Sequence, residues 1–134
     1  MSITDKELID KARKQAKYQK LKFDVKIGDV GCALITDKNN VYQGTSIDAR
    51  CGVGFCAESS AIAAMVTKGE FKIKKIVAVA CDGTIVPPCG RCREIIYEMD
   101  ESNWNAQVII GENKIVKLKE LLPNPWQKLY LNKD

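Results

Sequence analysis

The sequence contains no histidine, and this absence excludes several common kinds of active site. A Ser-His-Asp triad, a Cys-His pair and an H-E-x-x-H zinc site all require an imidazole ring. Histidine is also the side chain that most readily exchanges protons near neutral pH. A proton carrier that works near neutral pH in this chain is therefore expected to be a carboxylate or a metal-bound water.

Long apolar runs and a strong excess of one charge are missing as well. No stretch of about 18 apolar residues occurs, so we expect no membrane-spanning helix. Residues 1–7 are charged and lack the apolar core of a secretory signal, which indicates a cytoplasmic protein. The net charge is only +4, and the basic cluster at 11–22 has no interleaved aromatic ladder, so we expect no nucleic-acid partner.

What is present suits an ordinary globular fold. The 134 residues fit one domain spanning 1–134, with 46% hydrophobic and 28% charged residues. Periodicity and turn residues predict helices at 4–20, 57–67, 91–99 and 118–122, and strands at 30–36, 41–47, 75–81, 107–111 and 114–117. This alternation predicts a three-layer α/β/α fold with a mixed central sheet of about five strands.

The sequence contains six cysteines, at positions 32, 51, 56, 81, 89 and 92. In a chain without a recognisable secretory signal, clustered cysteines favour metal binding or catalysis over disulfides. Cys89 and Cys92 form a C-x2-C pair that enters a helix after two prolines, and Cys56 enters helix 57–67 from a glycine-rich loop. Cys32 and Cys81 lie in apolar strands, where we expect buried core residues.

Two helix starts that contain cysteines can bring three thiolates together when their strands are neighbours. Zinc prefers four ligands, and three protein ligands leave one position open for water. Glu58 lies in the first turn after Cys56, where its carboxylate can stand beside that water without binding the metal. The residues therefore favour an open Zn²⁺ site made by Cys56, Cys89 and Cys92.

The segments C-A-E at 56–58 and P-C-G-R-C at 88–92 together resemble the signature of the zinc-dependent cytidine deaminase superfamily, in its small three-cysteine, tetrameric form. V-G-C-A-L at 30–34 is similar to the first strand of that family, and L-L-P-N-P-W at 121–126 is similar to a segment near its C-terminus. Residues 88–93 also resemble a stretch of blasticidin S deaminases. The resemblance covers most of the chain.

The resemblance implies hydrolytic deamination of a cytosine-type nucleoside (cytidine, deoxycytidine or a modified cytosine nucleoside) to the uracil-type product, with release of ammonia. It implies that Cys56, Cys89 and Cys92 bind Zn²⁺ and that Glu58 is the catalytic proton carrier. A blasticidin S-type or other nucleoside analogue is the alternative substrate.

The resemblance also implies how the substrate is held. The backbone near Ala57 and Pro88 is expected to contact the base. Trp126 stands where the family has a phenylalanine that stacks on the base from a neighbouring subunit, which implies a homotetramer with shared active sites. The family holds the sugar with an N-V-E-N segment, where this chain reads T-S-I-D, so the candidate sugar contacts are Thr45, Ser46 and Asp48.

This chain also differs from the family in the arginine that offsets the negative charge of the metal site. Zn²⁺ with three thiolates has a net negative charge, and each helix N-terminus supplies about half an elementary positive charge. The family adds an arginine that bonds the cysteine ligands, in a C-A-E-R segment, but this chain has Ser59 at that position. Arg91 and Arg93 lie beside the cysteines and are the expected replacements.

Other interpretations remain open. Cys51 as a fourth ligand makes a closed, structural zinc site. The C-x2-C pair also suits thiol redox chemistry, although a redox pair usually follows the first strand of a thioredoxin-like unit. A nucleic-acid base-editing deaminase or a nucleoside-binding protein without turnover is a further alternative, against which the scattered charge and the intact Glu58 argue.

Overall fold

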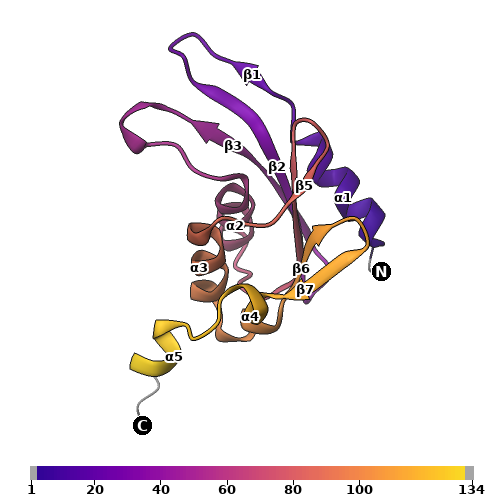
Figure 1. Ribbon diagram of the computed structural model, residues 1–134, viewed down its shortest axis with the longest axis vertical. Coiled ribbons are helices and arrows are strands. Elements are labelled where there is room, and N and C mark those ends of the chain that lie inside the picture. Colours follow the sequence, from indigo (N-terminus) through magenta and orange to yellow (C-terminus); the bar gives the residue numbers. More distant parts are fainter. Residues whose placement is uncertain (1–2, 132–134) are drawn as a thin grey trace.

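A mixed β-sheet separates two layers of helices in the computed structural model, which describes residues 3–131 (Figure 1). The longer strands lie side by side in the order β3, β2, β4, β6, β7. Their bounds, in that order, are Val41–Asp48, Lys26–Thr36, Ile73–Ala80, Gln107–Gly111 and Lys114–Lys117. The short strands β1 (Gln19–Lys20) and β5 (Ile85–Val86) pair with β2 and β4. Strands β4 and β6 run parallel and the other pairs antiparallel, which confirms the predicted mixed sheet.

Helices cover both faces of this sheet. Helix α1 (Asp5–Lys14) packs on one face, and α2 (Ala57–Thr67) and α3 (Gly90–Met99) lie on the other (Figure 1). The shorter elements are η1 (Arg50–Gly52), η2 (Glu101–Asn105), α4 (Leu118–Leu121) and α5 (Trp126–Tyr130). Among residues 3–131, no helix is both long and apolar enough to cross a bilayer.

Strand β2 supplies side chains to both layers in alternation, as a strand buried on both faces must. Ala33 and Ile35 belong to the apolar cluster that includes Leu8 of α1. Cys32 and Leu34 belong to the second cluster, which lies under α2 and α3. This alternation confirms the predicted three-layer α/β/α fold.

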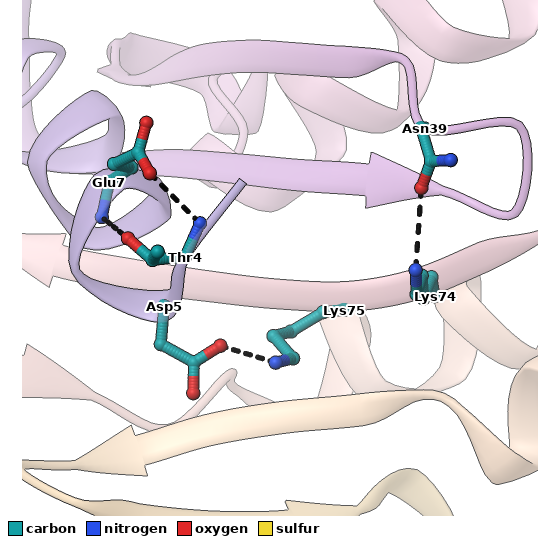
Figure 2. A network of polar contacts seen from close by, with 6 residues as sticks. All are labelled: Thr4, Asp5, Glu7, Asn39, Lys74 and Lys75. Carbon is teal, nitrogen blue, oxygen red and sulfur yellow. Dashed lines mark hydrogen bonds and ion pairs between the residues drawn. The ribbon is translucent and has the colours of Figure 1, made fainter. Parts of the chain in front are cut away.

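The start of α1 is capped by its own side chains (Figure 2). The Thr4 hydroxyl accepts a hydrogen bond from the Glu7 backbone N–H at 3.1 Å, and the Glu7 carboxylate accepts one from the Thr4 backbone N–H at 3.1 Å. An ion pair between Asp5 and Lys75 ties this first turn to β4. The reciprocal pair satisfies two of the N–H groups that a helix start leaves without partners.

Two sequence predictions are wrong at the ends of elements. The helix expected at 4–20 ends at Lys14, because the chain turns there and forms β1 along the edge of β2. Cys81, expected in the core, is exposed, because β4 ends at Ala80 and the chain turns away from the sheet. Cys32 is fully buried, as expected.

Candidate active site

Helices α2 and α3 both begin at a cysteine. Cys56 and Cys89 are the N-cap residues, both with extended backbones, and neither thiol caps its own helix. The two prolines before Cys89 prevent an earlier helix start. Cys92 follows in the first turn of α3 and is buried. The thiols of Cys56 and Cys89 can therefore interact with groups outside their own helices.

The three sulfur atoms meet between the two helix starts. Sγ of Cys89 lies 3.5 Å from Sγ of Cys56 and 3.5 Å from Sγ of Cys92, and all three lie within 4.8 Å of one another. A tetrahedral zinc ion with Zn–S bonds of about 2.3 Å sets its sulfur ligands about 3.8 Å apart, so the trio fits Zn²⁺.

Cys51 does not take part in this group. It is exposed in η1, and no further thiol or carboxylate of residues 3–131 joins the three sulfurs. Structural zinc sites are almost always closed by four protein ligands. The arrangement is instead that of an open site with three sulfur donors.

Burial makes it costly for these thiols to ionise together. Burial is the main cause that raises the pKa of Cys92 far above its usual range, and the Glu58 carboxylate adds to it. Burial also raises the pKa of Cys56. At Cys89 burial acts in the same direction, but hydrogen bonds from backbone N–H groups and from the neighbouring thiols outweigh it and lower the pKa. A bound divalent cation would lower the pKa of all three thiols, so that all three could be thiolates at once.

Glu58 places a carboxyl group at the same helix start. Its side chain is only 4% exposed, in the first turn of α2. Burial raises its pKa, although its own backbone N–H and the Cys92 thiol partly offset this effect. A carboxyl group whose pKa is raised takes up a proton more readily and can then return it.

A cleft of about 480 Å³ opens beside the sulfur group and reaches β2 and β3. Its wall includes two of the cysteines and the start of α2, at Cys56, Ala57, Glu58 and Cys89. Its larger apolar side chains are Val30, Ile47, Phe55, Val86 and Pro87, and its other polar ones are Asp29, Ser46, Asp48 and Arg91. Such a wall suits a ligand with a flat apolar ring and a polar substituent.

The residues predicted to hold the sugar divide between the two faces of β3. Ser46 and Asp48 line the cleft. Thr45 lies outside the lining, because its hydroxyl donates to the Gln15 carbonyl oxygen at 2.8 Å, beside the end of α1. The Ser46 hydroxyl accepts a hydrogen bond from the Val30 backbone N–H at 3.1 Å and keeps its own proton available for a ligand.

Sequence reasoning missed Asp29, which lines the cleft from a bulged part of β2. The neighbouring Gly28 has φ +78°, and a Cβ there would lie 1.9 Å from the Lys17 carbonyl oxygen. The only available signal was the place of Asp29 directly before the V-G-C-A-L segment. In the part of the chain that the structure describes, neither Asp29 nor Asp48 has an ion-pair partner.

The two arginines expected to compensate charge are used differently. Arg91 lines the cleft. Arg93 donates from Nε to the Pro88 carbonyl oxygen at 2.8 Å and from Nη1 to the Leu121 carbonyl oxygen at 3.1 Å. Pro88 is buried and is not part of the cleft lining, whereas its neighbours Pro87 and Cys89 are. The guanidinium group of Arg93 thus bonds to backbone carbonyls rather than to sulfur.

Trp126 lies outside the cleft of its own chain. It begins α5, which Figure 1 shows at one end of the molecule, and its side chain is 50% exposed. Its indole N–H donates to Glu94 at 3.0 Å, and the Gln127 amide donates to both Glu94 and Glu98. These contacts attach α5 to α3, the helix that contains Cys89 and Cys92.

Comparison with known proteins agrees with this geometry. The family model described as "Cytidine and deoxycytidylate deaminase zinc-binding region" matches residues 2–108. A cytidine deaminase of Sporosarcina psychrophila is 30% identical over 121 residues, covering 88% of this chain and 85% of the relative. A cytidine deaminase of Halalkalibacterium halodurans is 31% identical over 100 residues, with 72% and 76% covered. A blasticidin-S deaminase of Bacillus cereus is 36% identical over 106 residues, with 70% and 74% covered.

Solved structures share the fold. The crystal structure of cytidine deaminase from Mycobacterium tuberculosis superposes with a TM-score of 0.76 at 23% identity, covering 91% of this chain and 97% of that one. The cytidine deaminase from Burkholderia pseudomallei gives a TM-score of 0.73 at 23% identity, with 91% and 98% covered. Both superpositions thus extend over nearly the whole α/β/α fold.

Proposed function

The chain belongs to the zinc-dependent cytidine deaminase family, and on that premise we propose that it hydrolyses the exocyclic C–N bond of a cytosine-type nucleoside. The substrate and one water become the uracil-type nucleoside and ammonia. The observation that supports this most directly is a buried carboxyl group, Glu58, in the same cleft as a three-sulfur group.

Cys56, Cys89 and Cys92 would hold Zn²⁺ in this proposal. Their donor set and spacing fit that ion, and three ligands leave a coordination position open. When bound, the metal lowers the pKa of a water molecule so that it becomes a nucleophile near neutral pH. The N-termini of α2 and α3 both point positive dipole ends toward the thiolates and offset part of their charge.

Glu58 is the proposed proton carrier. Its carboxylate takes a proton from the attacking water and gives it to ring N3 while the new C4–O bond forms. It then moves the remaining hydroxyl proton to the exocyclic nitrogen, and the C4–N bond breaks as ammonia leaves. The raised pKa of a buried carboxyl group suits a residue that must accept and release a proton in each turnover.

The rest of the cleft is proposed to orient the nucleoside. The apolar wall packs against the base, whose polar edge faces the backbone near Ala57 and Pro88. The Pro88 carbonyl already accepts from Arg93, but an oxygen with two lone pairs can accept a second bond. Ser46 and Asp48 are the sugar contacts that we retain, because both line the cleft.

The proposal includes a homotetramer in which Trp126 completes a neighbour's site. The cleft of one chain is open, and Trp126 lies outside its wall. Helix α5 and the residue after it expose several large apolar side chains, namely Trp126, Leu129, Tyr130 and Leu131. A second chain that covers this surface would place an aromatic ring near the base of its neighbour.

A cytoplasmic setting is also part of the proposal. All six cysteines are free thiols. The site needs three of them reduced in order to bind the metal, and reducing compartments maintain that state.

A second candidate substrate is a positively charged nucleoside analogue such as blasticidin S. Two observations favour it: the similarity to the Bacillus cereus blasticidin-S deaminase, and two cleft carboxylates, Asp29 and Asp48, without ion-pair partners. Such carboxylates attract cations and repel phosphate, and they outnumber Arg91, the one basic side chain among residues 3–131 that lines the cleft. A cytosine nucleoside that carries a 5′-phosphate is correspondingly expected to be a poor substrate.

The test is ammonia release from a panel of cytidine, deoxycytidine, deoxycytidine 5′-phosphate, cytosine and blasticidin S. The proposed function predicts turnover of at least one nucleoside and little turnover of the phosphate. Asp48→Asn serves as a matched variant, because it should raise KM for the best substrate while the zinc content is unchanged. No ammonia from any member of the panel with zinc-loaded protein would overturn the proposed function.

A further inference from the structure

We propose that Arg93 is a positioning residue, which holds the backbone around Cys89 by directed hydrogen bonds and anchors it to α4. The inference rests on the proposed function, because it gives Cys89 the role of a zinc ligand. It changes the role expected for Arg93 from charge compensation to geometry. Arg93 makes three hydrogen bonds to backbone carbonyl oxygens.

Two of these bonds hold consecutive carbonyl groups. The Arg93 backbone N–H donates to the Cys89 carbonyl oxygen at 3.0 Å, as helix α3 requires. Its side-chain Nε donates to the Pro88 carbonyl oxygen at 2.8 Å. The peptide groups on both sides of the Cys89 Cα are therefore fixed by a single residue. Since these two planes set the direction of the Cα–Cβ bond, Arg93 helps to fix the point from which the Cys89 sulfur projects.

The third bond connects this loop to a rigid anchor. Nη1 of Arg93 donates to the Leu121 carbonyl oxygen at 3.1 Å, at the last residue of α4. That end is itself held, because Leu118 is fully buried and the Trp104 indole N–H donates to the Leu122 carbonyl oxygen at 3.2 Å. Helix-end carbonyls have no partner within their own helix, so an arginine there satisfies an otherwise free acceptor.

Geometry distinguishes this role from charge compensation. A guanidinium group has a rigid planar fork of donors, and here two of its nitrogens are directed at two separate carbonyl oxygens. In the described part of the chain, no hydrogen bond joins Arg93 to a cysteine sulfur. A lysine would keep the positive charge but could not reproduce the fork. Glutamine would lose the charge.

The experiment compares Arg93→Lys, Arg93→Gln and Arg93→Ala with the wild type, with Arg13→Gln as the matched control. Arg13 is exposed on α1, which packs on the opposite face of the sheet from α3. Within residues 3–131 its side chain pairs with Asp10 and does not line the cleft. The readouts are the rate of zinc release to a chelator, amide hydrogen exchange in residues 89–93 with and without zinc, and kcat and KM for the best substrate.

The positioning role predicts that all three Arg93 variants behave alike. Zinc release and amide exchange should each become about tenfold faster, and kcat should fall about tenfold or more, since a hydrogen bond from a charged donor is worth about that much. KM should change less than kcat. Guanidinium ions at millimolar concentration should partly restore kcat to Arg93→Ala, whereas ammonium ions should not. Arg13→Gln should match the wild type in every readout.

Charge compensation predicts a different pattern. If Arg93→Lys keeps wild-type zinc release, amide exchange and kcat while Arg93→Gln loses them, the positioning role is wrong. If Arg93→Ala fails to fold, the lysine variant carries the same test, because it retains the alkyl stem and the charge. If the wild type turns over no substrate, the proposed function fails, but zinc release and amide exchange still decide the role of Arg93.

Discussion

Helix α1 starts with a complete capping box between Thr4 and Glu7, whereas α2 starts at Cys56, whose thiol caps nothing in its own helix. Two of the first N–H groups of α1, those of Thr4 and Glu7, are satisfied by this capping box, which stabilises the start of the helix. The thiol of Cys56 lies instead with two other sulfurs, and the positive end of the helix dipole faces them. The two faces of the sheet therefore use the same element, a helix start, for different purposes.

Glutamate-to-glutamine changes in the first turn of each helix should separate the two purposes most strongly. Glu58→Gln is expected to lower kcat by about 10²–10⁴-fold, because positioned proton transfer contributes about that much. Zinc content and fold should be unchanged, since the shape of the side chain is kept. Glu7→Gln on α1 is the control and should retain kcat. Steady-state ammonia release with metal analysis measures both, and a Glu58→Gln enzyme with most of its rate would remove Glu58 from the mechanism.

Trp126, in the C-terminal helix α5, tests the proposed homotetramer with shared sites. Trp126→Ala should raise KM by about 5–150-fold, because stacking of a base on an aromatic ring is worth about 1–3 kcal/mol. Zinc content should not change, since Trp126 lies outside the sulfur group. Steady-state kinetics with metal analysis checks both expectations.

Hybrid assemblies give the control for that prediction. An excess of Glu58→Gln chains mixed with Trp126→Ala chains creates sites in which one chain supplies an intact Glu58 and its neighbour an intact Trp126. Such sites should partly restore the normal KM. A monomer by light scattering at assay concentration would contradict shared sites, whatever the kinetics.

The smallest effect is expected at the start of α1. Thr4→Ala removes one side of the capping box and should lower the free energy of unfolding by about 1 kcal/mol, with kcat unchanged. Thr4→Ser keeps a hydroxyl at the N-cap and should recover most of that loss. Denaturant unfolding of the zinc-loaded protein measures the difference. A lower kcat in Thr4→Ala without a loss of stability would contradict the conclusion that the start of α1 serves stability and the start of α2 serves the active site.

Local sequence signals predicted much of the fold and the centre of the site. Helix 57–67 was predicted with its observed bounds, because it begins at C-A-E and is followed by Gly69, whose φ of +80° ends the helix. The trio of cysteines was found because both helix starts can be recognised from short spacings. The three-layer order followed from alternating periodicity.

What the sequence did not reveal depends on contacts between distant segments. Helix α1 ends early because β1 must pair with β2, and periodicity within 4–20 contains no sign of that pairing. Asp29 reaches the cleft through a bulge in β2, next to Gly28, whose backbone packs against Lys17. Thr45 bonds to Gln15, which only the packing of α1 against the sheet could show.

An open zinc site with three sulfur ligands is the centre of the proposed mechanism, and metal content tests it directly. Wild type, Cys92→Ser and Cys51→Ser are expressed with ample zinc, passed through gel filtration and analysed by mass spectrometry for metals. The account predicts about one zinc ion per chain in the wild type and in Cys51→Ser, and almost none in Cys92→Ser. Loss of zinc from Cys51→Ser, or a folded wild type without zinc, would contradict it.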